Sequence, residues 1–237
     1  MLLGHPGFYG IVAELDGRVV GSNFMDERAP IAGVGPITVD PKVQNRGVGG
    51  HLMVNVLERA RQKKYPGVRL VQAAYHMRSL SLYTKLGYDT RETLSTMQGP
   101  PLNLTIPGYN VRAAADSDVE ACNRLCIRVH GHDRGSELAD AIKQRRAMVV
   151  ERGDRISGYT TAIAFFGHTV GETNDDVQAL IGAAGSFEGP GFLLPSRNAE
   201  LMRWCLTHGL RVIQQMTLMT IGLYNEPAGA WLPSVLY

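Results

Sequence analysis

Two hairpin patterns of alternating apolar and polar residues occur in this chain of 237 residues. Residues 12–21 read VAELDGRVVG and residues 149–158 read VVERGDRISG, so each segment has two β-branched runs around a Gly/Asp turn. A glutamate, an arginine and a glycine occupy matching positions in both segments, without a gap. Each pattern predicts two antiparallel strands, and the match between them predicts a structural unit that occurs twice.

An amphipathic helix is predicted after each hairpin. Apolar residues recur at helical spacing over residues 52–57 and again over residues 201–206. A run with strand character follows each helix, at residues 68–75 and 211–219. The chain is therefore predicted to be an α/β (α+β) protein built from two copies of one mixed strand-and-helix unit.

A polar stretch with several prolines, GPPLNLTIPG at residues 99–108, is the predicted linker between the copies. This boundary assigns residues 1–98 to the first unit and residues 109–237 to the second.

The second unit begins with a segment, residues 109–146, that has no counterpart in the first unit. It is predicted as a strand and two helices, the first opened by a capping box from Ser117 to Glu120 and the second by Ser136. The first unit is either naturally reduced or belongs to an N-terminally shortened form of a longer parent, without its first strand and helices. We expect the second alternative, since an isolated hairpin edge would otherwise lack cover.

Three glycines, Gly47, Gly49 and Gly50, lie where the strand-like run that ends near Val39 gives way to the first helix. The first backbone N–H groups of a helix have no internal acceptor, and the helix dipole adds partial positive charge there. Glycine removes the side chains that would keep a ligand away from these groups. Together with Arg46, the segment is predicted to bind a phosphate or pyrophosphate.

Two familiar phosphate-binding loops do not fit this segment. A P-loop ends in Gly-Lys-Ser/Thr, whereas this chain has Gly49-Gly50-His51. A dinucleotide-binding fingerprint needs a third glycine, and that position is Leu52. A helix start whose glycines only fit a tight turn is the alternative interpretation.

The pattern Gln44-x-x-Gly47-x-Gly49 resembles the pyrophosphate loop of the GNAT superfamily of N-acetyltransferases, written Q/R-x-x-G-x-G/A. A second element of the same family lies downstream. Residues 76–88, HMRSLSLYTKLGY, are similar to N-x-x-S/A-x-x-L-Y-x-K-x-G-F, with His76 in place of the usual asparagine. The two elements follow each other in the expected order, separated by a helix and a strand.

The resemblance is strong over residues 8–97, where Tyr88 replaces a usual phenylalanine. Residues 109–237 match only in layout, as a diverged second unit. The resemblance implies two tandem GNAT-like units, each a mixed, mostly antiparallel sheet flanked by helices.

Acetyl-CoA or coenzyme A is the cofactor that the resemblance implies. A backbone N–H near Val39 would polarise the thioester carbonyl, and a fixed donor of this kind is most effective in a dry site. Tyr83 would be the general acid that protonates the leaving thiolate. The residues expected to bind the cofactor are Ile37, Thr38, Val39, Gln44, Asn45, Arg46, Gly47, Val48, Gly49, Gly50, His76, Ser79 and Tyr83.

The general base is not evident from the sequence. The family often takes it from a glutamate on the strand before the glycine loop, but residues 33–39, GVGPITV, contain no carboxylate. Glu27 and Asp26, at the end of the second hairpin strand, are candidates. The C-terminal carboxylate of Tyr237 is another, because some tandem members of the family are thought to use theirs.

The second unit lacks the glycine loop. Residues 194–199 read LPSRNA at the matching junction, so a proline replaces one backbone donor. We expect this unit not to bind CoA and to help form the acceptor site, which gives one active site per chain. His130, His132 and Asp133 form a single turn without an evident distant partner, so no metal site is expected.

The composition limits the kinds of partner that the chain is expected to bind. The formal net charge of +2 is too small to predict nucleic-acid binding, and no apolar run approaches the roughly 20 residues that span a bilayer. The three cysteines, Cys122, Cys126 and Cys205, are interpreted as small buried side chains of a cytoplasmic protein.

The chain is thus expected to be an N-acyltransferase that moves acetyl from acetyl-CoA to a primary amine of a small molecule or protein. The resemblance also implies a homodimer. A catalytically inactive CoA-binding or sensing module is the alternative, because the base and the first segment of the unit are missing.

Overall fold

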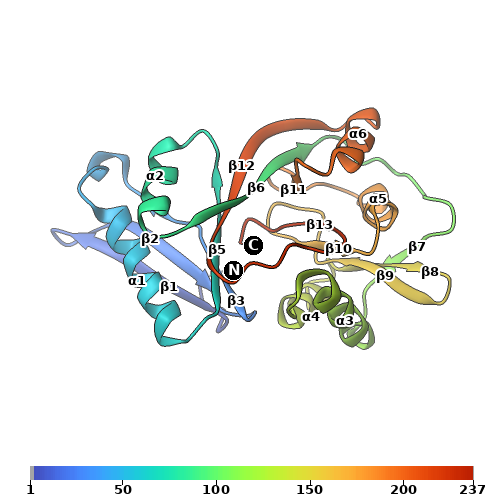
Figure 1. Cartoon of the computed structure of the whole chain (residues 1–237), viewed down its shortest axis with the longest axis horizontal. Helices are drawn as coiled ribbons and strands as arrows, with labels where there is room; N and C mark the ends of the chain where they lie inside the picture. Colours follow the sequence, from blue (N-terminus) through green and yellow to red (C-terminus); the bar gives the residue numbers. More distant parts are fainter. Residues whose placement is uncertain (1–2, 237) are drawn as a thin grey trace. The chain divides into compact units, whose positions relative to one another are not determined.

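The computed structural model describes residues 3–236 of the chain. The chain divides into two compact units (Figure 1). Unit 1 comprises Met1–Arg91, Leu218–Tyr224 and Leu236–Tyr237, and unit 2 comprises Glu92–Thr217 and Asn225–Val235. The mixed α/β class predicted from the sequence is confirmed in both units.

Unit 1 is a mixed sheet with two helices. The strand order is β1-β2-β3-β5-β12, in which β2 is antiparallel to β1 and to β3, while β3 and β5 are parallel. Its elements are β1 (Phe8–Leu15), β2 (Arg18–Asp26), β3 (Ile31–Val34), β4 (Thr38–Val39), the 3₁₀ turn η1 (Pro41–Val43), α1 (Val48–Gln62), β5 (Gly67–Ala73), α2 (Met77–Lys85) and the end of β12 (Arg211–Gly222).

The β1–β2 hairpin forms where the sequence predicts it. Asp16 and Gly17 occupy the turn with φ values of 51° and 73°. Positive φ at both central residues is the conformation that Asp-Gly favours, and its twist matches that of the paired strands.

Helix α1 buries one face against the sheet. Leu52, Met53, Val56 and Leu57 are at most 4% exposed, and the last three of them belong to one apolar cluster with residues of β3 and β5. These are the positions that the helical spacing of apolar residues predicts, so the amphipathic interpretation is confirmed.

Strands β3 and β5 separate within unit 1, and the candidate functional site lies where they separate. Their last paired residues are Val34 and Leu70. The chain then passes through Gly35 and Pro36 and resumes as β4, which pairs with β2 instead. Strand β5 therefore continues beyond the end of β3.

Unit 2 contains an antiparallel sheet of five strands and, outside that sheet, strand β6, which lies between the first part of β12 and β11. The sheet order is β13-β10-β9-β8-β7, and β6 pairs with β11. Its elements are β6 (Asp89–Gln98), β7 (Asn110–Ala113), the 3₁₀ turn η2 (Asp116–Asp118), α3 (Val119–His130), α4 (Gly135–Lys143), β8 (Met148–Arg152), β9 (Arg155–Thr160), β10 (Thr169–Gly171), α5 (Asn174–Ala183), β11 (Phe192–Pro195), α6 (Ala199–Thr207) and β13 (Ala230–Leu232).

The division into units differs from the expected boundary at residues 99–108. That stretch belongs to unit 2, where Leu102 and Ile106 pack on the core and the Leu104 N–H donates to the Gly182 carbonyl over 2.9 Å. Its apolar residues and backbone bonds therefore hold it in place. The chain passes between units inside β6 and β12, which a search for polar linkers does not detect.

Two predicted helix starts also need correction. The capping box from Ser117 to Glu120 is wrong, because residues 116–118 form a 3₁₀ turn and the Asp118 carboxylate accepts the Ala115 N–H over 2.8 Å. Helix α4 begins at Gly135, one residue before the expected Ser136. An aspartate near several N–H groups can satisfy any of them, so spacing alone does not select the cap.

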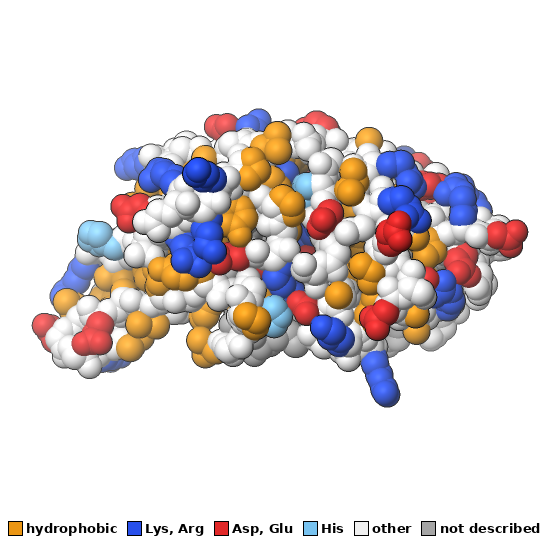
Figure 2. All heavy atoms as spheres, turned by 90° about the horizontal axis from the view of Figure 1, so that it is seen from below, with side chains coloured by type: hydrophobic (Ala, Val, Ile, Leu, Met, Phe, Trp, Pro, Cys, Tyr) orange, Lys and Arg blue, Asp and Glu red, His pale blue; other side chains and the backbone are white. Residues whose placement is uncertain are grey.

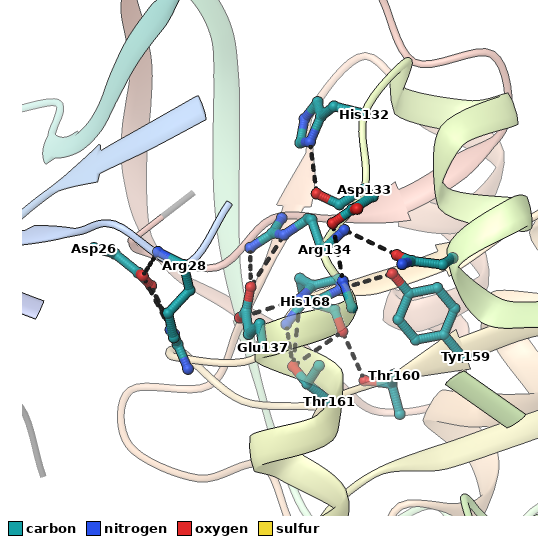
Figure 3. A network of polar contacts seen from close by, with 12 residues as sticks. Asp26, Arg28, His132, Asp133, Arg134, Glu137, Tyr159, Thr160, Thr161 and His168 are labelled. Atoms are coloured by element: carbon teal, nitrogen blue, oxygen red, sulfur yellow. Dashed lines mark hydrogen bonds and ion pairs between the residues drawn. The ribbon is translucent and has the colours of Figure 1, made fainter. Parts of the chain in front are cut away.

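A buried polar network lies in unit 2 (Figure 3). Glu137 accepts from Arg134 over 2.6 Å through Oε2 and contacts His168 Nδ1 over 3.1 Å through Oε1. The other nitrogen of His168, Nε2, lies 2.9 Å from the Tyr159 hydroxyl. All four residues are at most 8% exposed, so the network connects α4, β9 and the loop before β10 inside the unit.

We expect the change Glu137→Leu to lower the free energy of unfolding by about 3–5 kcal/mol, because it leaves the Arg134 charge buried without this carboxylate. Urea denaturation measures the change. Glu120→Leu is the matched control, since Glu120 is exposed on α3, and its effect should stay within about 0.5 kcal/mol. Equal effects of the two changes would contradict the structural role of the network.

The three cysteines are free and buried, which confirms their interpretation as small buried side chains. Burial raises the pKa of the Cys122 thiol to about 12 and that of the Cys205 thiol to about 12, and it also raises the pKa of Cys126. A raised pKa keeps each thiol protonated at neutral pH, and the protonated form is a poor nucleophile.

Native protein at pH 8 should therefore react slowly with a chromogenic disulfide reagent, whereas protein in concentrated urea should react at all three cysteines within minutes. Absorbance of the released thiolate counts the reactive groups. Rapid labelling of one thiol in the native protein would show that its helix or strand opens locally.

Candidate functional site

The connection from β4 to α1 forms the first part of the candidate site. Asp40 organises it: its carboxylate accepts the Lys42 N–H over 2.9 Å and pairs with Arg18 over 2.6 Å. Asn45 and Gly47 then adopt positive φ, at 71° and 82°. Asp40 is not among the residues predicted from the motifs, although an aspartate before a proline is a recognisable turn-starting signal.

The start of α1 leaves backbone donors available. Gly47 is the N-cap residue, and its carbonyl accepts the His51 N–H over 3.0 Å. The N–H groups of Val48, Gly49 and Gly50 precede the first intrahelical bond, and among residues 3–236 no side chain caps them. These three donors and the helix dipole point toward the exposed loop, which suits an anion.

Nothing in the described part of the chain requires glycine at positions 49 and 50. A Cβ on Gly49 would lie 3.7 Å from Val39 Cγ2, and one on Gly50 would lie 4.0 Å from Leu82 Cδ1, which are ordinary contacts. Gly21 on β2 is different, because its Cβ would lie 2.8 Å from the Thr38 carbonyl oxygen. The absence of side chains at positions 49 and 50 thus leaves room for a ligand to approach the helix start closely. The fit of a tight turn alone does not explain these two glycines.

The remaining loop residues lie at the surface around these donors. Gln44, Asn45 and Arg46 are exposed, and Val48 is half-buried. The Arg46 guanidinium can therefore reach an anion held by the helix start. On the face drawn in Figure 2, acidic and basic side chains are interspersed, in keeping with the small net charge.

Strand β4 forms the second part of the site. Val39 pairs with Gly21 and Thr38 pairs with Ser22, whose hydroxyl lies 2.8 Å from Thr38 Oγ1. Ile37 is half-buried beside the apolar cluster of α1 and α2. Since β4 pairs with β2 and β5 continues past Leu70 without β3 beside it, the two strands diverge at this point.

Helix α2 contributes Tyr83, which is 6% exposed. Its ring lies edge-on to that of Tyr88, with 6.1 Å between centroids. Burial raises the pKa of Tyr83, and a hydrogen bond with Ser79 opposes this effect without cancelling it. The phenol therefore keeps its proton at neutral pH and can donate it. His76, the N-cap residue of α2, is exposed and stacks near Tyr75.

The candidate carboxylate bases are both held by arginines. Glu27 pairs with Arg59 through two bonds of 2.8 and 3.0 Å, and this pairing lowers the pKa of Glu27. Asp26 pairs with Arg28 over 2.6 Å. A carboxylate stabilised in its charged form is a weaker proton acceptor, so the pairing with Arg59 favours a structural role for Glu27.

The remaining candidate base, Tyr237, lies outside the described residues. Leu236 is the last one described, and its carbonyl oxygen lies 1.8 Å from the place where a Cβ on Gly33 would be. Glycine at position 33 thus lets the end of the chain cross β3 within unit 1.

The matching junction of unit 2 is satisfied internally. The Asn198 side chain caps α6 by accepting the Leu201 N–H over 3.2 Å. Arg197, in the same turn, pairs with Glu92 over 2.6 Å and with Glu226. The first turn of α6 is thus capped by the chain itself, unlike the start of α1.

A search for metal ligands within residues 3–236 finds no group of three or more His, Cys, Asp or Glu side chains that could hold an ion. His132 Nδ1 lies 3.2 Å from the Asp133 carbonyl oxygen, and the His130 ring packs edge-on against Trp231. Across the same residues, no helix is both long and apolar enough to cross a membrane.

Comparison with known proteins agrees with the geometry of unit 1. Residues 2–88 match the model of the acetyltransferase (GNAT) family. A segment of 53 residues, 22% of this chain, is 42% identical to a mycothiol acetyltransferase of Brachybacterium faecium and spans 16% of that protein.

Two solved structures are similar over most of the chain. One, from Pyrococcus horikoshii and provisionally named an acetyltransferase, has a TM-score of 0.76 at 16% identity, covering 94% of this chain and 76% of that one. A tandem GNAT protein from the clavulanic acid biosynthesis pathway has a TM-score of 0.55 at 14% identity, covering 92% and 84%. At these identities the likeness concerns the fold, and it agrees with the predicted two-unit architecture. Residues 2–88 are therefore similar to the acetyltransferase (GNAT) family, and the fold of the chain is similar to that of a tandem GNAT protein.

Proposed function

We propose that this chain is an acyl-CoA-dependent N-acyltransferase, which moves acetyl from acetyl-CoA to a primary amine of a small molecule or protein. The observation that carries the proposal is the start of α1, where Val48, Gly49 and Gly50 present backbone donors without a side-chain cap. The family match over residues 2–88 and the name of the Brachybacterium relative give the proposal its chemistry.

The residues around the helix start fit coenzyme A. The three N–H groups would hold its pyrophosphate, and Arg46 would add a charge-assisted bond. The segment from Ile37 to Val39 would bind the pantetheine arm through its backbone. When bound, acetyl-CoA supplies an acyl group that is activated as a thioester.

Two groups of the chain would assist acyl transfer. The Val39 N–H would stabilise negative charge on the acyl oxygen, because a fixed donor there does not need to reorganise. The Tyr83 hydroxyl would give its proton to the departing sulfur, which its raised pKa allows at neutral pH. Ser79 would orient the phenol through their hydrogen bond.

A catalytically inactive CoA-binding module is the second candidate function. It is favoured by the ion pair of Glu27 with Arg59, because a carboxylate whose pKa is lowered in this way is poorly suited to deprotonate an amine. The two candidates make the same prediction for cofactor affinity but differ in turnover.

We expect Gly49→Glu to abolish CoA binding, because the new side chain would occupy the space in front of the helix start and repel the pyrophosphate. Isothermal titration with CoA measures the affinity. Gly185→Glu is the matched control: Gly185 is exposed in unit 2, no atom lies within 4 Å of its Cβ position, and CoA affinity should not change. Retained affinity in Gly49→Glu would refute the assignment of the loop.

We expect Tyr83→Phe to lower kcat by about 10²-fold, as is typical for loss of a general acid, while CoA affinity stays within about twofold. Thiol release from acetyl-CoA across a panel of amines gives the rate. Tyr109→Phe in unit 2 is the control and should keep the wild-type rate. Tight CoA binding without turnover of any amine by the wild-type protein would favour the binding module.

A further inference from the structure

Gln72, near the end of β5, is a buried polar side chain whose contacts within the chain do not account for it. It is 6% exposed, and neither its Oε1 nor its Nε2 has a hydrogen-bond partner among residues 3–236. Burying a carboxamide in this way costs about 1–3 kcal/mol, and an apolar residue would avoid that cost. Its presence on an otherwise apolar strand face therefore indicates a partner from outside residues 3–236.

The position of Gln72 places it at the divergence of the strands. Leu70 forms the last pair with β3, and Gln72 follows two residues later, beyond that pairing. Side chains alternate along a strand, so Gln72 faces the same side of the sheet as Val68 and Leu70. Both belong to the apolar cluster that contains Tyr83, so Gln72 lies on the Tyr83 side of β5.

A second buried polar group lies in the same cluster. Tyr88 is 1% exposed, and its hydroxyl also has no hydrogen-bond partner within the described residues. Its ring contacts that of Tyr83, the proposed general acid. Apolar side chains surround both tyrosines, including Leu82, which lies against Gly49 and Gly50 at the helix start.

We propose that Gln72 is a further cofactor-binding residue, whose side-chain NH₂ donates a hydrogen bond to the carbonyl oxygen of the acyl thioester. This inference rests on the proposed function and adds a contact to the acyl end of the same ligand. A neutral carboxamide in an apolar setting suits a neutral carbonyl, because no counter-charge is required. The pyrophosphate, by contrast, would lie at the exposed helix start, where charge is tolerated.

The substitution Gln72→Met tests this assignment, because it keeps the length of the side chain and removes both polar atoms. Without ligand, the variant should be more stable than wild type, since an unsatisfied buried amide is gone. Its affinity for acetyl-CoA should fall about five- to tenfold, while affinity for free CoA, which lacks the acyl carbonyl, should stay within about twofold. Urea denaturation and isothermal titration measure the two effects.

Gln98→Met is the matched control. The Gln98 amide is satisfied in unit 2, where Nε2 donates to the carbonyls of Phe187 and Gly189 over 3.1 and 3.2 Å. The same substitution there should lower stability and leave both affinities unchanged. Only Gln72→Met should combine increased stability with a selective loss of acetyl-CoA.

A measurement on the wild-type protein makes the test independent of folding of the variant. In ¹⁵N-labelled protein, the side-chain NH₂ signal of Gln72 should shift when acetyl-CoA is added and shift less with CoA. Equal losses of acetyl-CoA and CoA affinity in Gln72→Met, or unchanged affinity for both, would overturn the inference. Absence of acetyl-CoA binding by wild type would instead refute the proposed function itself.

Discussion

The constraint on which the site of unit 1 depends is the start of helix α1, which no side chain of the described residues caps. Every α-helix leaves its first N–H groups without intrahelical acceptors, and most chains supply a side-chain oxygen for one of them. Helix α6 follows this rule through Asn198. Helix α1 begins with Gly47 at positive φ and two further glycines, so its donors stay available and its stabilisation is left to an anion. Turn η1 and the Asp40 carboxylate fix the direction of approach.

The two units therefore differ in whether the polar groups at the start of this helix find hydrogen-bond partners within the chain, as well as in layout. Both have a hairpin, a helix and a following strand in the same order. In unit 2 the matching turn is closed by Asn198 and by Arg197, which pairs with Glu92 and Glu226. The groups of this turn that could bind a ligand therefore already have hydrogen-bond or ion-pair partners from the chain. Two units with the same order of elements can thus differ in which backbone groups remain available to a ligand.

Local patterns predicted most of the elements, because the interactions that form them are local. The Asp-Gly turn and the apolar face of α1 depend on residues close in sequence, and both agree with the structure. The boundary between units did not follow from such patterns, since the chain crosses between units inside β6 and β12. Local patterns also could not predict the ion pair of Glu27 with Arg59, because the two residues are 32 positions apart in the sequence. This ion pair changes how the Glu27 carboxylate is interpreted. Motifs identified the loop and Tyr83, but not the groups on β5.

Several polar groups of unit 1 have no hydrogen-bond partner among the described residues, and these groups share one location. The first N–H groups of α1, the Gln72 carboxamide and the Tyr88 hydroxyl belong to elements that surround the divergence of β4 and β5. Each costs stability in the free protein, and a chain selected for stability alone would replace or cap them. Departures from local rules are expected where a ligand completes the structure. The helix start suits an anion, whereas the Gln72 and Tyr88 side chains suit neutral hydrogen-bonding groups. Their shared location therefore suits one ligand that has an anionic end and a neutral end with amides or carbonyls. Coenzyme A thioesters have this distribution of groups, and a simple phosphate does not.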